Sequence, residues 1–168
     1  GPDAPLAQAE TAFDRLIESA LVHQVGFVVF AGDVYDGAER GVRAQLRFRD
    51  GLQRLSDAGI RSFVAHGNHD PVEEGWSAID RFAELVTVFG AGEVRSVPFS
   101  VGGEPVTVHG VSYGVARVTE NLARRCGRPT APGLHVGVLH ANVGNNPAHA
   151  PYSPCSLGDL LDVGLDYW

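Results

Sequence analysis

Apolar residues along the chain follow two alternating patterns. Helical spacing at i, i+3, i+4 and i+7 runs through residues 6–22 and returns in residues 39–58, which predicts two amphipathic helices. A continuous apolar run rich in β-branched and aromatic residues occupies 26–31, and such a run suits a central strand that is covered on both faces. The mainly apolar segment 60–65 is expected to form another strand. The order helix, strand, helix, strand with short loops predicts crossover units and a largely parallel sheet. The polar stripe of the second helix is expected to face solvent: Arg43, Arg47 and Arg54.

The second half of the chain is patterned differently. Residues 77–85 are expected to form a short helix and residues 86–89 a short strand. Two β-forming segments, 94–101 and 105–110, flank Gly102-Gly103 and predict a hairpin. The remaining expected elements are a helix over 118–126, a strand over 134–140, a helix over 157–163 and the beginning of a strand over 165–168. No linker divides the chain, so a single domain over residues 1–168 is predicted.

Composition and charge exclude several classes of protein. With 44% hydrophobic and 20% charged residues, the 168-residue chain has the composition of a core-forming domain and not of a disordered one. No apolar run is long enough to cross a bilayer, and the start at Gly1-Pro2-Asp3 has no signal-peptide pattern, so a cytoplasmic location is expected. Cys126 and Cys155 lack the spacing of a thiolate metal site. The net charge of −7 argues against general nucleic-acid binding, but bound cations can neutralise an acidic cluster in an enzyme that acts on nucleic acid.

Three predicted strands end in side chains that can bind metals. The acidic loop Gly32-Asp33-Val34-Tyr35-Asp36-Gly37 follows the first strand, Gly67-Asn68-His69-Asp70 follows the second, and His140 ends the strand over 134–140. Because the carboxyl ends of parallel strands lie on one edge of a sheet, Asp33, Asn68 and His140 are expected to converge. A carboxylate, an amide and an imidazole suit manganese, iron, zinc or magnesium better than a thiophilic metal.

His69 and Asp70 are the candidate catalytic residues. His69 can donate a proton to a leaving group or bind a phosphoryl oxygen, and Asp70 is expected to hold His69 in position, as carboxylates do for histidine. Asp36 is left open between a supporting role and that of a loop carboxylate. The other histidines match no ligand spacing and are assigned structural roles: His23, His66, His109, His135 and His149.

These motifs make the sequence similar to the calcineurin-like metallophosphoesterases. Gly32-Asp33-x-x-Asp36, Gly67-Asn68-His69-Asp70 and Val138-Leu139-His140 resemble three of the five motifs of that superfamily in spacing and order. Within it, the stretch from His140 to Trp168 is most similar to bacterial SbcD-like and YhaO-like DNA repair exonucleases. The resemblance implies an α/β sandwich of two mixed β-sheets flanked by helices, with the site at the strand ends between the sheets.

The resemblance also implies a dinuclear metal centre for phosphodiester hydrolysis. Asp33 would bridge the two ions, Asn68 and His140 would bind the second ion, and His69 would stabilise the transition state or protonate the leaving oxygen. Manganese is the first expectation for both ions, with magnesium, iron and zinc as alternatives. The implied partners are DNA, as duplex ends or single strands, and an SMC-type ATPase subunit; a homodimer is left open.

Two motifs of the family are absent from the sequence: the opening Asp-x-His and the closing Gly-His-x-His. The chain is therefore expected to be a nuclease domain trimmed at both ends, and weakly active or inactive as it stands. Two alternatives remain open. One is another enzyme of the superfamily, a phosphomonoesterase or a small-molecule phosphodiesterase, and the other is a non-catalytic module that keeps the fold to bind a partner.

Overall fold

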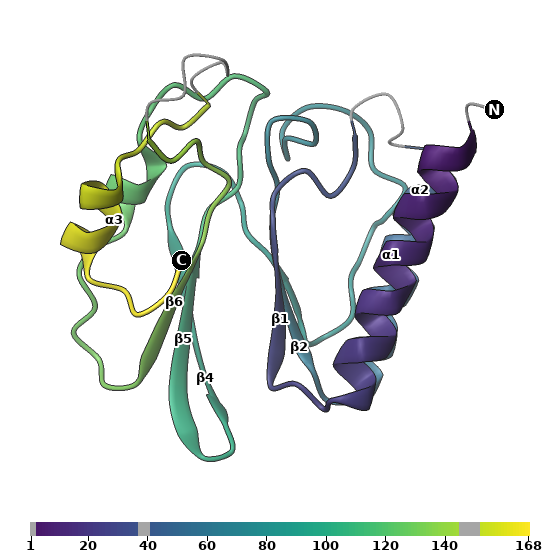
Figure 1. Cartoon of the computed structure of the whole chain (residues 1–168), viewed down its shortest axis with the longest axis horizontal. Coiled ribbons are helices and arrows are strands. Elements are labelled where there is room, and N and C mark those ends of the chain that lie inside the picture. Colours follow the sequence, from purple (N-terminus) through teal and green to yellow (C-terminus); the bar gives the residue numbers. More distant parts are fainter. Residues whose placement is uncertain (1–2, 37–40, 145–151) are drawn as a thin grey trace.

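The computed structural model describes residues 3–36, 41–144 and 152–168, and of residues 3–7 only the backbone. Figure 1 shows four layers, with helices α1 (Asp3–Val22) and α2 (Val42–Asp57) on one side, two β-sheets in the middle and α3 (Leu157–Val163) on the other side. This arrangement confirms the predicted α/β fold of two stacked sheets flanked by helices. None of the helices in the described ranges is both long and apolar enough to span a membrane.

The first sheet has the order β1-β2-β3, and its strands β1 (Phe27–Ala31), β2 (Arg61–Ala65) and β3 (Val86–Val88) are all parallel. The central strand β2 is buried on both faces, because Val64 packs toward the helices while Phe63 and Ala65 pack toward the second sheet. The expectation that the run at 26–31 forms a central strand is not met, since β1 lies at an edge of this sheet in the described residues. Its apolar pattern reflects cover on both faces, which an edge strand shares with a central one.

The second sheet is mixed, with the order β4-β5-β6. Strands β4 (Arg95–Val101) and β5 (Glu104–Gly110) pair antiparallel around Gly102-Gly103, which confirms the predicted hairpin, and β6 (Leu134–Val138) pairs parallel with β5. The first sheet is thus wholly parallel and only the second is mixed. The strand expected over 165–168 is reduced to one bridge, between Val136 and Tyr167.

The helix predicted over 77–85 is wrong, because this segment forms turns and irregular backbone. The side chain of Gln45 in α2 donates to the Trp76 carbonyl at 3.4 Å and accepts from the Ala78 N–H at 2.8 Å. These bonds tie the backbone at Trp76 and Ala78 to α2, and the one to Trp76 engages the carbonyl that would accept the first hydrogen bond of such a helix. The helix predicted over 118–126 is shortened to a single 3₁₀ turn, η2 (Leu122–Arg125).

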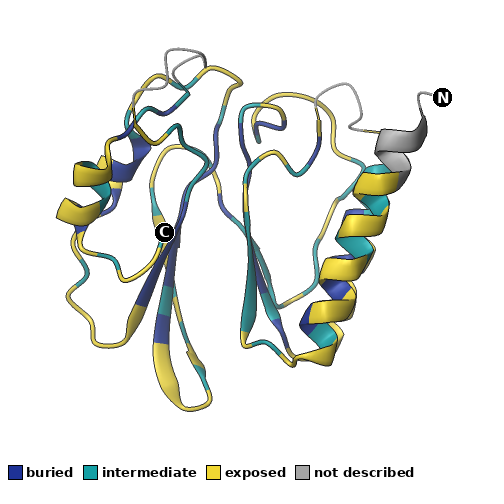
Figure 2. Ribbon diagram, viewed as in Figure 1, coloured by how far each residue is buried: buried dark blue, intermediate teal, exposed yellow. Residues whose placement is uncertain are grey.

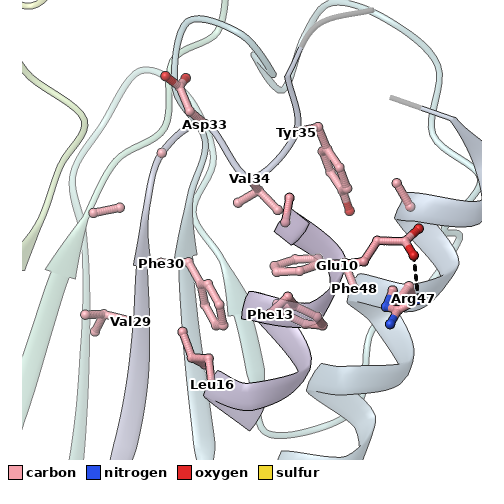
Figure 3. Close-up of a pocket in the computed structure, with 14 residues that line it drawn as sticks. Glu10, Phe13, Leu16, Val29, Phe30, Asp33, Val34, Tyr35, Arg47 and Phe48 are labelled. Carbon is pink, nitrogen blue, oxygen red and sulfur yellow. Dashed lines mark hydrogen bonds and ion pairs between the residues drawn. The ribbon is translucent and has the colours of Figure 1, made fainter. Parts of the chain in front are cut away.

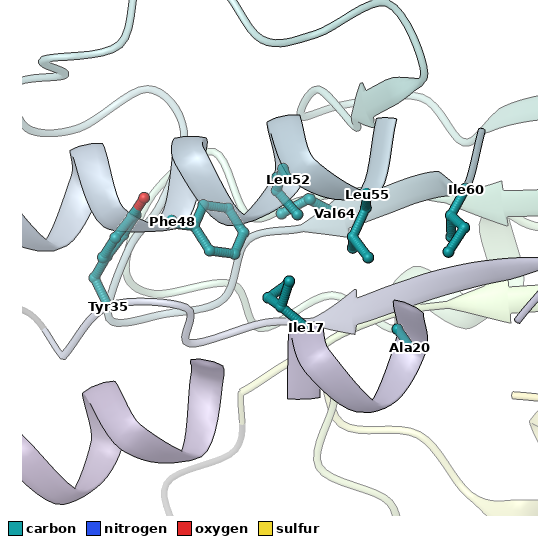
Figure 4. Packing of buried hydrophobic residues seen from close by; sticks show 8 residues of the cluster. All are labelled: Ile17, Ala20, Tyr35, Phe48, Leu52, Leu55, Ile60 and Val64. Carbon is teal, nitrogen blue, oxygen red and sulfur yellow. The ribbon is translucent and has the colours of Figure 1, made fainter. Parts of the chain in front are cut away.

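An apolar cluster joins the two long helices to the first sheet. Figure 4 shows Ile17 of α1 facing Leu52 and Leu55 of α2 and Val64 of β2. A second cluster lies between the sheets and includes Phe63, Phe89, Val108, Val136 and Val138. In Figure 2 the buried residues accordingly lie on the strands and on the inward side of α1, while its outer side is exposed.

The sequence pattern predicted that the arginine stripe of α2 faces solvent, but arginines of this stripe form ion pairs with α1. Arg47 lies 2.9 Å from Glu10 and also pairs with Asp14, while Arg54 pairs with Glu18, all three acidic residues belonging to α1. Helical periodicity finds the stripe but cannot show that an acidic stripe on α1 lies beside it. The ion pairs therefore line the rim of the α1–α2 contact.

Candidate metal centre

The loops that follow β1, β2 and β6 meet at one edge of the molecule, where the three expected metal ligands come together. The imidazole Nε2 of His140 lies 2.9 Å from Asn68 Oδ1 and 3.4 Å from Asp33 Oδ2. The side chains of Asp33 and His140 are 37% and 23% exposed, so the cluster is open to solvent on one side. The structure thus brings together Asp33, Asn68 and His140, and their role as ligands stays a prediction.

Close backbone packing sets this geometry. A Cβ atom at Gly32 would lie 2.1 Å from His140 Nδ1, and one at Gly67 would lie 2.4 Å from Asp33 Oδ1, so neither position has room for a side chain. Asp33 itself has a φ of 49°, in the left-handed region. Non-glycine residues in that region cost about 1–3 kcal/mol and cluster at functional sites, where surrounding contacts hold them.

The ring of His140 is oriented so that Nε2 points at oxygen atoms. Its Nδ1 lies 3.2 Å from the carbonyl oxygen of Ala31, which can only accept, so Nδ1 carries a proton. Tyr113 packs against the ring with a centroid distance of 5.5 Å and an interplanar angle of 77°. Nε2 then faces Asn68 Oδ1 and Asp33 Oδ2, two acceptors, and this arrangement needs either a proton or a metal cation between the three atoms.

The donor set fits one divalent ion. Two ligand atoms that each lie about 2.1 Å from an ion are about 3.0 Å apart at a right angle, and the separations of 2.9 and 3.4 Å around His140 Nε2 are close to this. Within the described ranges no group of three or more His, Cys, Asp or Glu side chains is placed to hold a metal, so the third donor is the amide of Asn68. Among the described residues a second ion would share only Asp33, so the described donors alone are too few for the two-ion centre that the resemblance implies.

His69 lies beside these donors and is paired with Asp36. Its backbone N–H donates to Asp33 Oδ1 at 3.2 Å, and its Nδ1 lies 2.7 Å from Asp36 Oδ1. The hydrogen bond to Asp36 raises the pKa of His69 above its ordinary value, and this outweighs the opposing effect of burial. The side chain of His69 is 48% exposed and so remains accessible to a substrate. Asp36, whose role the sequence left open, is thus the partner of His69.

Asp70 does not make the expected contact with His69. Its carboxylate is fully buried and accepts hydrogen bonds from His66 Nδ1 at 2.8 Å and from the Gly67 N–H at 2.8 Å. Burial tends to raise the pKa of Asp70, but the His66 and backbone hydrogen bonds outweigh it and hold the pKa below its usual value. Adjacent residues in a turn point in different directions, which is why Asp70 faces inward while His69 faces solvent.

An apolar pocket of about 400 Å³ adjoins the centre between α1, α2 and β1. Figure 3 shows Phe13, Phe30 and Phe48 around it, with Asp33 at the rim and its carboxylate directed away from these rings. The pocket's other charged side chains, Glu10 and Arg47, bind each other at 2.9 Å. Of the three proposed donors, Asp33 thus lies at the rim of the pocket, whereas Asn68 and His140 do not line it.

Sequence reasoning missed two residues that support the centre, His66 and Tyr113. His66 directly precedes the Gly-Asn-His-Asp motif, and that adjacency was an available signal, whereas nothing in the pattern marks Tyr113. Of the other histidines assigned structural roles, His109 and His135 are buried and bonded to each other at 2.9 Å, and His149 lies outside the described residues.

Similarity to known proteins extends over most of the chain. The family described as calcineurin-like phosphoesterase matches residues 4–142. A Bacillus subtilis protein named as the uncharacterized metallophosphoesterase YhaO is 34% identical over 155 residues, which cover 92% of this chain and 38% of that protein. The DNA double-strand break repair protein Mre11 of Thermoplasma acidophilum is 34% identical over 103 residues, 60% of this chain and 27% of that protein. One subunit of the nuclease SbcCD from Escherichia coli is 33% identical over 66 residues, 39% of this chain and 16% of that protein. The chain therefore spans well under half the length of these relatives.

Proposed function

Because the chain belongs to the calcineurin-like phosphoesterase family, we propose that it hydrolyses phosphodiester bonds with the help of divalent metal ions. The observation that carries this proposal is the convergence of Asp33, Asn68 and His140 from three separate strand ends. When bound, a divalent ion at such a site acidifies water and neutralises phosphate charge. The donor set favours a metal that accepts oxygen and nitrogen ligands, and we propose Mn²⁺.

Each residue of the centre has a distinct proposed role. Asp33, Asn68 and His140 hold the ion. The Asp36 carboxylate engages Nδ1 of His69, which leaves Nε2 as the ring nitrogen that faces a phosphoryl oxygen or donates a proton to the leaving oxygen. Asp70 is too deeply buried to touch a substrate, so its contribution is to hold the loops. Because three donors coordinate one ion incompletely, we expect slow turnover by the chain itself.

We further propose that the substrate is DNA and that the enzyme acts as a repair exonuclease. The support comes from the names of two relatives, a double-strand break repair protein and a nuclease subunit. The term subunit also supports a partner protein, for which the sequence resemblance implies an SMC-type ATPase. A phosphomonoesterase or small-molecule phosphodiesterase of the same family is the alternative.

The test compares the wild-type chain with Asp33→Asn in Mn²⁺, using linear duplex DNA and bis(4-nitrophenyl) phosphate as substrates. Asp50→Asn is the matched control, because Asp50 is an exposed carboxylate of α2 that pairs with the neighbouring Arg49 among the described residues. We expect slow hydrolysis of both substrates, lost in Asp33→Asn and retained in Asp50→Asn.

The outcomes separate the candidate functions. Hydrolysis of the ester without degradation of DNA would favour a small-molecule phosphodiesterase. A wild-type chain that neither binds Mn²⁺ nor hydrolyses either substrate would contradict the proposal and favour a non-catalytic module.

A further inference from the structure

One buried carboxylate ties together the two loops that carry the proposed ligands. Oδ2 of Asp70 accepts the backbone N–H of Val34 at 2.9 Å and that of Tyr35 at 3.4 Å. These are the first two residues after Asp33. Oδ1 of the same carboxylate accepts the N–H of Gly67 at 2.8 Å, directly before Asn68. The orientation of this carboxylate therefore sets how far apart the two loops lie.

One side chain also contacts this carboxylate, that of His66. Its Nδ1 lies 2.8 Å from Asp70 Oδ2. Since that oxygen already accepts two backbone N–H groups, it acts as an acceptor here as well, and Nδ1 of His66 is the donor. The described donors to the carboxylate are thus three backbone N–H groups from the two loops and one side chain, His66, which adds a third donor on Oδ2.

His66 is itself held rigidly. Its backbone N–H donates to Ser112 Oγ at 2.9 Å, and its backbone carbonyl oxygen accepts from the Tyr113 N–H at 3.0 Å. Its ring stacks on Tyr35 with a centroid distance of 6.5 Å. The Ser112 hydroxyl in turn donates to the Phe89 carbonyl at 2.6 Å. His66 thus connects the segment at Ser112 and Tyr113 to the carboxylate of Asp70.

We propose that His66 is a positioning residue for the metal centre. By donating from Nδ1 to Asp70, it keeps the Asp33 loop and the Asn68 loop at the separation that a shared ion requires. It touches neither the ion nor a substrate. The inference rests on the proposed function, because it assumes that Asp33 and Asn68 bind a divalent ion.

Two amide substitutions isolate the role of Nδ1. In His66→Asn the side-chain amide nitrogen can occupy the place of Nδ1 and keep the donor to Asp70. In His66→Gln the amide reaches instead to the place of Nε2, so the donor at Nδ1 is lost although polarity and hydrogen-bonding groups are kept. His66→Ala removes the whole side chain.

The readout is the affinity for Mn²⁺ alone, measured by the electron paramagnetic resonance signal of the free ion during titration of the whole chain. Thermal unfolding followed by circular dichroism shows whether each variant is folded. We expect His66→Gln and His66→Ala to bind Mn²⁺ about 10–100-fold more weakly, the usual loss when a partner of a metal ligand is removed. His66→Asn should stay close to the wild type.

Equal affinity in all folded variants would overturn the inference, and so would a loss in His66→Asn as large as that in His66→Gln, because the donor position would then be irrelevant. Asp33→Asn distinguishes this failure from a failure of the proposed function. Mn²⁺ binding that does not depend on Asp33 would overturn the proposed function and the inference with it. Binding that depends on Asp33 but not on His66 would overturn the inference alone.

The wild type provides a test that does not depend on the variants folding. Nitrogen-15 spectra of the imidazole are expected to show a proton on Nδ1 of His66, with hydrogen exchange that slows when Zn²⁺ is added. A proton on Nε2 alone, or exchange that Zn²⁺ leaves unchanged, would refute the positioning role.

Discussion

A chain of hydrogen bonds centred on two buried histidines of the second sheet makes the stability of the protein depend on pH. His135 Nε2 lies 2.9 Å from the carbonyl of Ala131, which can only accept, so in the neutral ring His135 Nδ1 is an acceptor. His109 Nε2, at 2.9 Å, then donates to it, and Ser96 Oγ donates to His109 Nδ1 at 2.8 Å. The one carboxylate among the described polar contacts of these residues is that of Asp166. It accepts the backbone N–H of His135 at 2.8 Å and so does not contact either ring through this bond. When both rings are neutral, each of these hydrogen bonds has one donor and one acceptor. An additional proton on either ring would be buried, with no anionic partner among the described contacts of the two rings.

Protonation of His109 is therefore more favourable in the unfolded chain. Burial first, and then the neighbouring His135, lowers the pKa of His109 in the folded protein. A lowered folded pKa gives a contribution to stability that is fully present above the unfolded pKa of about 6.5 and is lost as pH falls from there toward the folded value. If the folded protein keeps His109 neutral, the loss at pH 5.5 approaches about 1.4 kcal/mol, or about 3–6 °C in the melting temperature of a domain of this size.

The assay is urea unfolding at pH 7.5 and pH 5.5 for the wild type and His109→Gln. Glutamine can keep the donor to His135 but cannot titrate, so its loss of stability between the two pH values should be smaller by up to about 1.4 kcal/mol. Titrating groups that do not contact residue 109 are common to both proteins and cancel in the difference. His23→Gln is the control, because His23 is exposed, and it should behave like the wild type. An identical pH dependence in His109→Gln and the wild type would refute the reasoning.

Three further predictions test the metal centre, the core between the sheets and the rim of the α1–α2 contact. Gly32→Ala should weaken Mn²⁺ binding at least about 10-fold, as loss of an orienting contact does, because the new Cβ would lie 2.1 Å from His140 Nδ1. Gly59→Ala is the matched control, since Gly59 has a similar φ but nothing within 4 Å of an added Cβ, and it should bind Mn²⁺ normally in the same titration. Phe63→Ala should lower the free energy of unfolding by about 3–5 kcal/mol in urea, since Phe63 is fully buried between the sheets. Arg54→Ala should cost less than about 1 kcal/mol and no more in high salt than in low salt, because its pair with Glu18 is exposed.

Much of the fold could be predicted because its elements carry strong local patterns. The segment 60–65 ends in three consecutive apolar residues, Phe63 to Ala65, as a strand buried on both faces requires, and it forms β2 at the centre of its sheet. The pair Gly102-Gly103 adopts φ values of 59° and 91°, which glycine reaches without strain, so the hairpin could be located from two residues. Both features depend on residues close in the sequence.

The failures have the opposite character, because each depends on a partner far along the chain. Residues 77–85 have the composition of a short helix, but a side chain of α2 binds the backbone at Trp76 and Ala78. The edge position of β1 is a property of the sheet and leaves no trace in the strand's own residues. Such contacts override local preference and cannot be read from a periodic pattern.

The same distinction explains what the sequence showed of the centre. Asp33 and Asn68 could be placed together because they follow neighbouring parallel strands of one sheet, whose carboxyl ends share an edge. His140 follows β6 of the second sheet, so it joins them through the packing of the two sheets and not through this rule. The roles of Asp70 and His66 depend instead on which way adjacent side chains point. Asp70 is bonded to residues 36 and 35 positions away, at Val34 and Tyr35, and to its near neighbours His66 and Gly67, while His69 turns outward to Asp36. A polar motif of four residues thus divides between a solvent-facing half and a buried half. The solvent-facing half has the geometry for chemistry, and the buried half holds the loops that make this geometry.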